Sequence, residues 1–423
     1  MTNNHKKKSK IDFLLVFWFS LLGVLTLGCI LLVVWIGPSE LVAAINQAGE
    51  ESGGSAGENI IQVVGEKIEK VEEKLKEEDN SRYGAVLKDT EKMAENHIYA
   101  KEAADPDKIT MAFAGDILFD KQYAVMSTIE RSGNGIKSAF SAPLWEEMQA
   151  ADIFMLNNEF PYTERGTPLE GKLYTFRAVP ETASYLQEMG VDIVTLANNH
   201  ASDFGEVSLL DSLDTLDALG MPHVGAGRNL EEASHPAYFI INDTKIAVVS
   251  ATQIERLDIP DTKGATAVTP GVFRCWDPTK LLEVIGEAKQ NSDFVVVYVH
   301  WGTENDAAPD WAQLDQVGKI ADAGADLIIG DHPHVLQQID IVDGVPVIYS
   351  LGNYLFNSKK VDTCLVKVEI ANDKLQSFQF VPVLQEGCHA TLLDGFEKER
   401  VLSYMQQIST NVTIDADGYL QLP

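Results

Sequence analysis

The amino-acid sequence predicts an α/β (α+β) fold in which sheets are flanked by helices, preceded by one N-terminal transmembrane helix. Three observations lead to this prediction. An uncharged apolar run lies near the N-terminus, short β-rich runs alternate with helical patterns from Ile109 onward, and most of those runs end in a polar residue or a glycine. Alternating β and α units imply a central sheet that helices cover.

The N-terminal run predicts a membrane anchor. Residues 13–36 are 24 positions without a charge, enough to cross a bilayer as a helix. We therefore expect a cytoplasmic basic tail at 1–10 and a single-pass anchor in the cell membrane at 11–37. Lysines precede the run and acidic residues follow it, which places the main domain outside the cytoplasm. A cleaved signal peptide is the alternative, although its apolar core would normally be shorter.

Residues 38–108 are expected to form a linker and an amphipathic stalk helix. The stretch GEESGGSAGEN has the composition of a flexible linker. The 3-4-3-4 spacing of five apolar residues that follows is typical of a short amphipathic helix: Ile61, Val64, Ile68, Val71 and Leu75. We expect a solvated stalk, with weak homo-oligomer contact as the alternative. The main domain is predicted at 109–390 and a C-terminal extension at 391–423.

Composition excludes several classes of function. A net charge of −30 argues against general nucleic-acid binding, because a polyanion would be repelled over most of the surface. An anionic substrate must therefore be held locally, by metal or by a few basic groups. The four cysteines show no CxxC spacing, so neither a zinc knuckle nor a redox motif is predicted. The sequence also lacks the GxxxxGK[ST] motif of P-loop proteins.

The β-rich runs of the main domain place its functional groups. In chain order they are ITMAFAGD, DIFMLNNE, DIVTLANN, KIAVVSAT, DFVVVYVH, DLIIGD and VPVIYSLGN. Between them, ETASYLQEMG and VSLLDSLDTLDALG show helical patterns. From about Asp362 the pattern becomes strand-rich and ends in a short helical stretch. Functional groups in such folds gather at the loops after the strand ends, so those loops supply the candidates.

Oxygen- and nitrogen-donor side chains follow five of these runs. They are Asp116; Asn157, Asn158 and Glu159; Asn198, Asn199, His200 and Asp203; His300 and Glu304; and Asp331, His332 and His334. Imidazole together with carboxylate suits Mn, Zn or Fe better than Ca or Mg. Paired metals about 3.5–4 Å apart are a common device for in-line attack on a phosphate. The sequence therefore predicts one or two divalent transition-metal ions at one rim of the fold.

The motif series resembles that of a known family. The strings AGDILF, NNEFP, LANNHASDFG, VHWGTE, GADLIIGDHPHVLQ and IYSLGNYLF occur in order between Ile109 and Asn357. They are similar to the motifs of the CapA family, which comprises capsule or poly-γ-glutamate biosynthesis proteins with a calcineurin-like metallophosphoesterase fold. Proteins of that family are commonly tethered to the membrane with the domain outside, as the N-terminal run predicts.

The resemblance implies roles for individual residues. Metal ligands are expected at Asp116, Glu159, Asn199, His300, His332 and His334. Catalytic roles are expected for His200, which would assist the leaving group, and for Asn199 and Asp203. Contacts that orient these groups or reach substrate are expected from Glu304, Asp331, Arg177 and Asn158. Asp203 and Glu304 in particular would orient imidazoles.

Three positions depart from the phosphoesterase pattern. The opening motif has Leu118 where Asp-x-His would place a histidine, so the first metal loses a ligand. The bridging carboxylate is Glu159 instead of an Asp. Asp120 stands where many relatives have an Arg, which removes a phosphate contact.

Three functional hypotheses follow. The first is metal-dependent hydrolysis of a phosphoester or related bond during cell-surface polymer synthesis. The second is a non-catalytic accessory subunit of a polymer synthase or exporter, whose metal rim binds an anionic polymer such as poly-γ-glutamate. The third is a metal-free binding module, which would require the donor side chains to be scattered in the fold.

Overall fold

The computed structural model describes residues 81–254 and 262–422. Helix α4 (Gly84–Leu87) belongs to a first unit that ends at Lys88, and Asp89 begins a second unit that contains the remaining described elements. The predicted transmembrane anchor and stalk helix lie outside the described residues. Within the described ranges, no helix is both long and apolar enough to span a membrane.

The first sheet of the second unit has the strand order β17-β16-β15-β2-β3-β4-β5, and β14 also pairs with β2. Its strands are β2 (Ile109–Ile117), β3 (Ile153–Asn158), β4 (Ile193–Thr195), β5 (His223–Val224), β14 (Asn353–Leu355), β15 (Val361–Ala371), β16 (Lys374–Glu386) and β17 (His389–Leu392). Strands β2 to β5 are parallel neighbours, whereas β15, β16 and β17 extend the sheet in antiparallel fashion.

The second sheet has the order β1-β7-β8-β10-β11-β13-β12. Its strands are β1 (Ile98–Ala100), β7 (Ala237–Ile241), β8 (Thr244–Thr252), β10 (Phe294–His300), β11 (Leu327–Asp331), β12 (Ile339–Val342) and β13 (Val345–Ile348). Strands β8, β10, β11 and β13 are parallel. All seven residues of β10, FVVVYVH, are buried, as expected for a parallel strand covered on both faces. Two short strands, β6 (Ala226–Gly227) and β9 (Gly271–Val272), pair separately.

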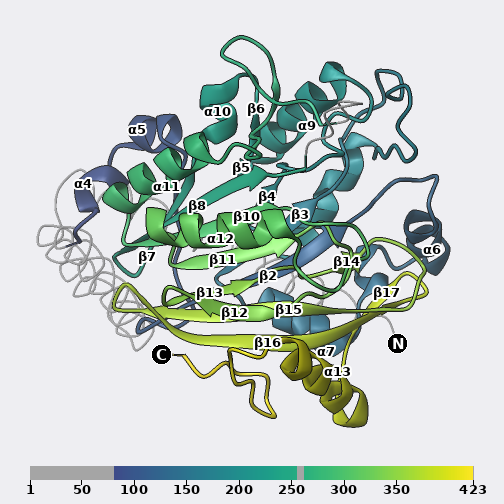
Figure 1. Cartoon of the computed structure of the whole chain (residues 1–423). Helices are drawn as coiled ribbons and strands as arrows, with labels where there is room; N and C mark the ends of the chain where they lie inside the picture. The colour runs from purple at the N-terminus through teal and green to yellow at the C-terminus, as the bar shows by residue number, and fades with distance from the viewer. Residues whose placement is uncertain (1–80, 255–261, 423) are drawn as a thin grey trace, which may run out of the picture. The chain divides into compact units, whose positions relative to one another are not determined.

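Helices cover the outer faces of both sheets (Figure 1). The first sheet shares a core with α6 (Ala124–Ser132), α7 (Ala142–Gln149), α8 (Ser184–Glu188) and α9 (Glu206–Leu219). Helix α11 (Thr279–Asn291) contacts the second sheet at β8 and β10, and α12 (Trp311–Ala323) contacts β12. The other elements are α5 (Thr90–Glu95), α10 (Leu230–Ser234), α13 (Gly395–Ile408), and the 3₁₀ helices η1 (Ile136–Ala139) and η2 (Pro180–Ala183).

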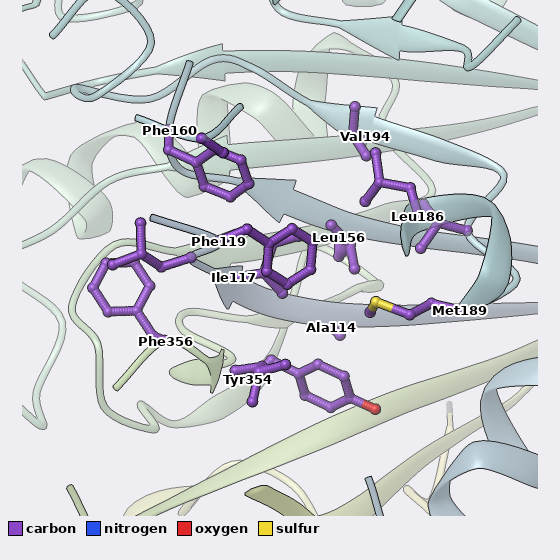
Figure 2. Close-up of a cluster of buried hydrophobic side chains, with 14 of the residues drawn as sticks. Ala114, Ile117, Phe119, Leu156, Phe160, Leu186, Met189, Val194, Tyr354 and Phe356 are labelled. Carbon is purple, nitrogen blue, oxygen red and sulfur yellow. The ribbon is translucent and has the colours of Figure 1, made fainter. Parts of the chain in front are cut away.

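Two apolar cores hold the layers together. One lies between the sheets, where Met111 and Phe113 of β2 share a cluster with Val296 and Tyr298 of β10. The other lies between the first sheet and its helices, and Figure 2 shows part of it, including Phe119 and Phe160 with ring centroids 5.5 Å apart. Burial at about 25 cal/mol per Å² of apolar surface makes these cores the main stabilising term.

The predicted fold class is confirmed as mixed α/β sheets flanked by helices. Each of the seven β-rich runs contains a strand, and the two helical patterns contain α8 and α9. After Asp362 the strand-rich stretch forms β15, β16 and β17, followed by α13. The three described cysteines, Cys275, Cys364 and Cys388, are buried, and no disulfide joins them.

A close backbone approach brings β14 against the end of β2. The Asp116 N–H donates to the Gly352 carbonyl at 3.3 Å. A Cβ atom on Gly115 would lie 1.9 Å from that same carbonyl oxygen. Only a residue without a side chain permits this contact, so Gly115 sets the distance between the two strands.

Replacement Gly115→Ala is therefore expected to lower the melting temperature, since overpacking costs about 1–3 kcal/mol or more. Gly286→Ala is the matched control. Gly286 lies inside α11, where an added Cβ would be 3.9 Å from the Ala323 carbonyl oxygen, and alanine there should stabilise the helix by about 0.5–1 kcal/mol. Thermal unfolding of the two variants checks this, and an unchanged melting temperature for Gly115→Ala would contradict the close approach.

Candidate metal centre

The ends of strands from both sheets bring the predicted donors together. Asp116 near the end of β2 pairs in register with Asn157 of β3, and His300 ends β10 opposite Asp331 at the end of β11. These four side chains and that of Glu159 are fully buried. The rim predicted from the strand ends is therefore a real cluster, and the donors do not have the scattered arrangement that the hypothesis of a metal-free module requires.

One group of donors surrounds Nε2 of His300. Asn199 Oδ1 lies 2.8 Å from this nitrogen, His332 Nδ1 lies 3.0 Å away, and Glu159 Oε1 lies 3.7 Å away. Candidate ligand atoms of Glu159, His300 and His332 all lie within 4.8 Å of one another. This group contains the donors predicted for the second metal.

The other group surrounds Nδ1 of His334. Asp116 Oδ2 lies 3.0 Å from this nitrogen, and Asn353 Oδ1 lies 2.9 Å from it. Candidate ligand atoms of Asp116, Glu159 and His334 again lie within 4.8 Å of one another. Glu159 thus belongs to both groups, as a bridging carboxylate would.

The state of Glu159 tests whether a cation fits. Both carboxylate oxygens are buried, and neither finds a hydrogen-bond partner among the described residues. Burial, together with the charge of Asp116, raises the pKa of Glu159 well above its usual range. A buried carboxylate without partners is costly, and a divalent cation would compensate it. The donor set fits one or two divalent ions.

Neighbouring groups orient the donors. Asp331 Oδ1 lies 3.0 Å from His300 Nδ1, on the ring nitrogen opposite to the one that faces the donors. The Asn157 amide donates to Asp116 Oδ1 at 2.8 Å, and Asn198 donates to Asn157 Oδ1 at 2.9 Å. Carboxylate–histidine pairs of this kind fix the tautomer and orientation of metal-binding imidazoles.

At Asp116, His300 and His332, electrostatics favours the protonation states that metal ligands need. Burial raises the pKa of Asp116, but the hydrogen bond and charge of His334 outweigh it and lower that pKa to about 2. Burial lowers the pKa of His300 to about 3 and that of His332 well below its usual range. An ionised carboxylate and neutral imidazoles are the forms that bind metals.

The HPH turn places two imidazoles in different donor groups. His332 has φ 95° and His334 has φ 60°, both in the region that residues with a side chain seldom adopt. Such conformations cost about 1–3 kcal/mol each and persist where the surroundings enforce them. Here the turn directs His332 to His300 and His334 to Asp116.

His200 forms a separate network beside the donors. Its Nδ1 lies 2.7 Å from Asp203 Oδ2, and its Nε2 lies 4.0 Å from Glu159 Oε1. Lys172 donates to Asp203 Oδ1 at 2.6 Å and also to the Asn199 carbonyl. The Phe176 ring packs over His200 with centroids 4.3 Å apart. The imidazole is thus fixed with Nε2 on the side of the metal ligands.

One predicted contact differs in the structure, and two other residues make contacts outside the donor groups. Glu304 is exposed, and no hydrogen bond joins it to an imidazole within 81–254 and 262–422, so the prediction that it orients one is wrong. Gly302 and Asn305, on either side of Glu304 in the chain, have left-handed φ values of 89° and 61°. Asn158 donates to the Phe160 carbonyl, and the Arg177 guanidinium lies 4.5 Å from the Phe204 ring centroid.

The site includes two residues for which no role was predicted. Asn353 is held beside Asp116 by the pairing of β14 with β2. Its signal was present, since VPVIYSLGN ends in a polar residue as the other runs do. Lys172 lies in a loop between Thr163 and Phe176, and no local pattern marks it.

Comparison with known proteins identifies the family of this chain. Residues 110–358 match the model of a family described as bacterial capsule synthesis protein PGA_cap. The chain belongs to this family. It is 30% identical over 282 residues to the PGA biosynthesis protein CapA of Bacillus subtilis (strain 168), covering 66% of this chain and 72% of that protein. It is 29% identical over 306 residues to the capsule biosynthesis protein CapA of Bacillus anthracis, covering 70% and 72%.

Among solved structures, the fold is similar to the 5′-nucleotidase of Candida albicans SC5314. The TM-score is 0.37 at 11% identity, and the match covers 67% of this chain and 53% of that chain.

Added Mn²⁺ is expected to raise the melting temperature of the full-length protein, and Glu159→Gln should abolish most of that increase. An ion that binds only the folded chain stabilises it by about 2.7 kcal/mol at a hundredfold excess over Kd. Glu304→Gln removes the same charge nearby without removing a donor, so it should leave the increase intact. A full increase in Glu159→Gln would exclude Glu159 as a ligand.

Proposed function

We propose that this protein is a membrane-anchored, extracytoplasmic member of the family that hydrolyses a phosphoester or related bond during capsule or poly-γ-glutamate synthesis, using one or two divalent ions. The observation that carries the proposal is the shared, unpartnered carboxylate of Glu159 between two donor groups. A structural ion would need only one closed set of ligands, whereas a carboxylate common to two groups is typical of two-metal hydrolytic sites.

The donor groups define what the ions would contribute. Asp116, Glu159 and His334 would hold one ion, and Glu159, Asn199, His300 and His332 would hold the other. Bound there, Mn²⁺, Zn²⁺ or Fe²⁺ would supply a Lewis acid for a phosphoryl oxygen and would lower the pKa of water. Asp331, through its contact with Nδ1 of His300, keeps the Nε2 atom of that ring directed at the donor group.

His200 is placed to transfer a proton to a leaving oxygen. Because Asp203 lies at Nδ1, the Nε2 atom is the one available to substrate beside Glu159. Lys172 neutralises Asp203 and also donates to the Asn199 carbonyl. The same ammonium group therefore helps to position both His200, through Asp203, and the proposed metal ligand Asn199. Phe176 covers the ring and excludes water from that face. Burial lowers the pKa of His200, so the imidazole must gain a proton at Nε2 before it can donate one to a leaving oxygen.

The membrane anchor at 13–36 supports an extracytoplasmic location. An apolar run of this length preceded by lysines favours a single pass with the cytoplasmic N-terminus. The resulting tether would hold the metal centre close to polymer synthase or exporter subunits in the same membrane. Its phosphoester or anionic polymer substrate would then meet the site at the cell surface.

His200→Asn is expected to lower hydrolysis of a model phosphodiester by about 10²–10⁴-fold, the usual contribution of a general acid. The number of bound ions should not change, because His200 is absent from the donor groups. His389→Asn, at an exposed position on β17, is the control. An undiminished rate in His200→Asn would remove this residue from the mechanism.

Lys172→Met is expected to reduce kcat by about tenfold or more while the bound ions stay in place, as is usual for groups that orient a catalytic residue. The variant keeps most of the side-chain volume but leaves Asp203 without its cation. Lys121→Met, at an exposed position, should behave like the parent protein. Steady-state kinetics and metal analysis of the same samples measure both effects. Parent kinetics in Lys172→Met would show that the ion pair serves folding alone.

One observation favours a second function, that of a non-catalytic accessory subunit. Leu118 is buried in the core behind the first donor group, so the histidine ligand expected at this position is absent. In that case the ions would hold an anionic polymer without cleaving it. Phosphodiester turnover and poly-γ-glutamate retention, measured on one metal-analysed sample, separate the two functions. Turnover supports the hydrolase, and retention without turnover supports the accessory subunit.

A further inference from the structure

Hydrogen bonding from His334 Nδ1 explains only one of its two close oxygen contacts. Asp116 Oδ2 and Asn353 Oδ1 both lie within 3.0 Å of this nitrogen. An imidazole nitrogen carries at most one hydrogen, which lies in the plane of the ring and is directed to one acceptor. One of the two oxygens is therefore close to His334 without a good hydrogen bond from it.

The same crowding occurs in the other donor group. Asn199 Oδ1 lies 2.8 Å from His300 Nε2, with His332 Nδ1 and Glu159 Oε1 as further neighbours. In each group, an asparagine amide oxygen lies within 3 Å of an imidazole nitrogen, and that imidazole belongs to a candidate ligand set that includes Glu159. Asn353 thus occupies in the first group the position that Asn199 occupies in the second.

The fold fixes Asn353 in this position. Asn353 pairs in register with Asp116. On either side of it, the Asp116 N–H donates to the Gly352 carbonyl and the Leu118 N–H donates to the Leu355 carbonyl, and these hydrogen bonds hold the backbone of β14. The Asn353 side chain is buried, at 4% exposure. The same strand pairing leaves Leu118 in the apolar core, where it contributes no donor.

We propose that Asn353 Oδ1 is a direct ligand of the ion held by Asp116, Glu159 and His334, in place of the histidine that is absent at Leu118. This assignment rests on the proposed function, because it requires a bound ion. It makes the two ion positions unequal. The first has three oxygen donors and one imidazole, a set suited to Mn²⁺, whereas the second has two imidazoles and favours Zn²⁺ or Fe²⁺ more strongly.

Calorimetric titration of the chelator-treated, full-length protein with Mn²⁺ tests the assignment. The parent protein is expected to bind two ions. Asn353→Ala should weaken one of them by at least about tenfold and leave the other unchanged, since loss of even an orienting group typically costs 10–100-fold. Asn353→Asp keeps an oxygen donor and adds a charge, so it should bind both ions at least as tightly as the parent.

Tyr354→Phe is the matched control on β14. The Tyr354 hydroxyl is buried and lacks a hydrogen-bond partner among the described residues. Its removal alters β14 beside Asn353 but leaves every side chain of the two donor groups in place. It should retain both ions. Melting temperatures in chelator establish that each variant is folded before it is titrated.

The outcomes separate the two claims. Two ions bound with parent affinity in folded Asn353→Ala would overturn the assignment of Asn353, as would equal weakening in Asn353→Ala and Asn353→Asp. Both results would leave the proposed metal dependence intact. Absence of Mn²⁺ binding in the parent protein would instead overturn the proposed function itself, and the assignment with it.

Discussion

The buried carboxylate of Glu159 is the constraint on which the candidate site depends. Its two oxygens lack hydrogen-bond partners among the described residues, yet they lie near donors from both sheets. In the absence of a cation, burial and the charge of Asp116 favour its neutral form. A folded chain gains nothing from such an arrangement, because an apolar residue of similar volume would avoid the desolvation cost. The arrangement becomes favourable when a divalent ion binds, so the stability of this region would depend on whether the site holds an ion.

The scaffold maintains this arrangement through backbone contacts as much as through side chains. Gly115 lets the backbone at Gly352 approach β2, and Gly330 lets β11 approach the Tyr349 carbonyl, where an added Cβ would lie 2.2 Å away. The HPH turn accepts left-handed conformations at both histidines. Each of these features either restricts the backbone or strains it at the rim, and so has a cost in folding free energy. The apolar cores on both faces of the first sheet offset that cost, so the strained rim lies on a rigid support.

Much of the fold and most of the donor set could be predicted from the sequence. Buried parallel strands consist of unbroken apolar runs, and their ends can be located by the polar residue that follows, which identified Asp116, Glu159, His300 and His332. Asn353 was missed although its run ends in a polar residue, because its place beside Asp116 depends on pairing between β14 and β2 across more than two hundred residues. Lys172 was missed since a loop lysine has no periodic signal. Glu304 was assigned wrongly because turn conformation, which sequence spacing does not specify, directs it to solvent.

Charge connects the metal ligands to substrate capture. The chain carries a net charge of −30, so a phosphoester or an anionic polymer approaches a repulsive surface. The nearby cations have other partners: Arg165 pairs with Asp211, Arg177 lies over Phe204, and Lys172 is bound to Asp203. Apart from Arg177, whose charge the Phe204 ring does not neutralise, positive charge for a substrate would therefore come mainly from the ions themselves. Removal of the ions should then abolish substrate affinity together with turnover, whereas in a site with its own basic pocket it would abolish turnover alone.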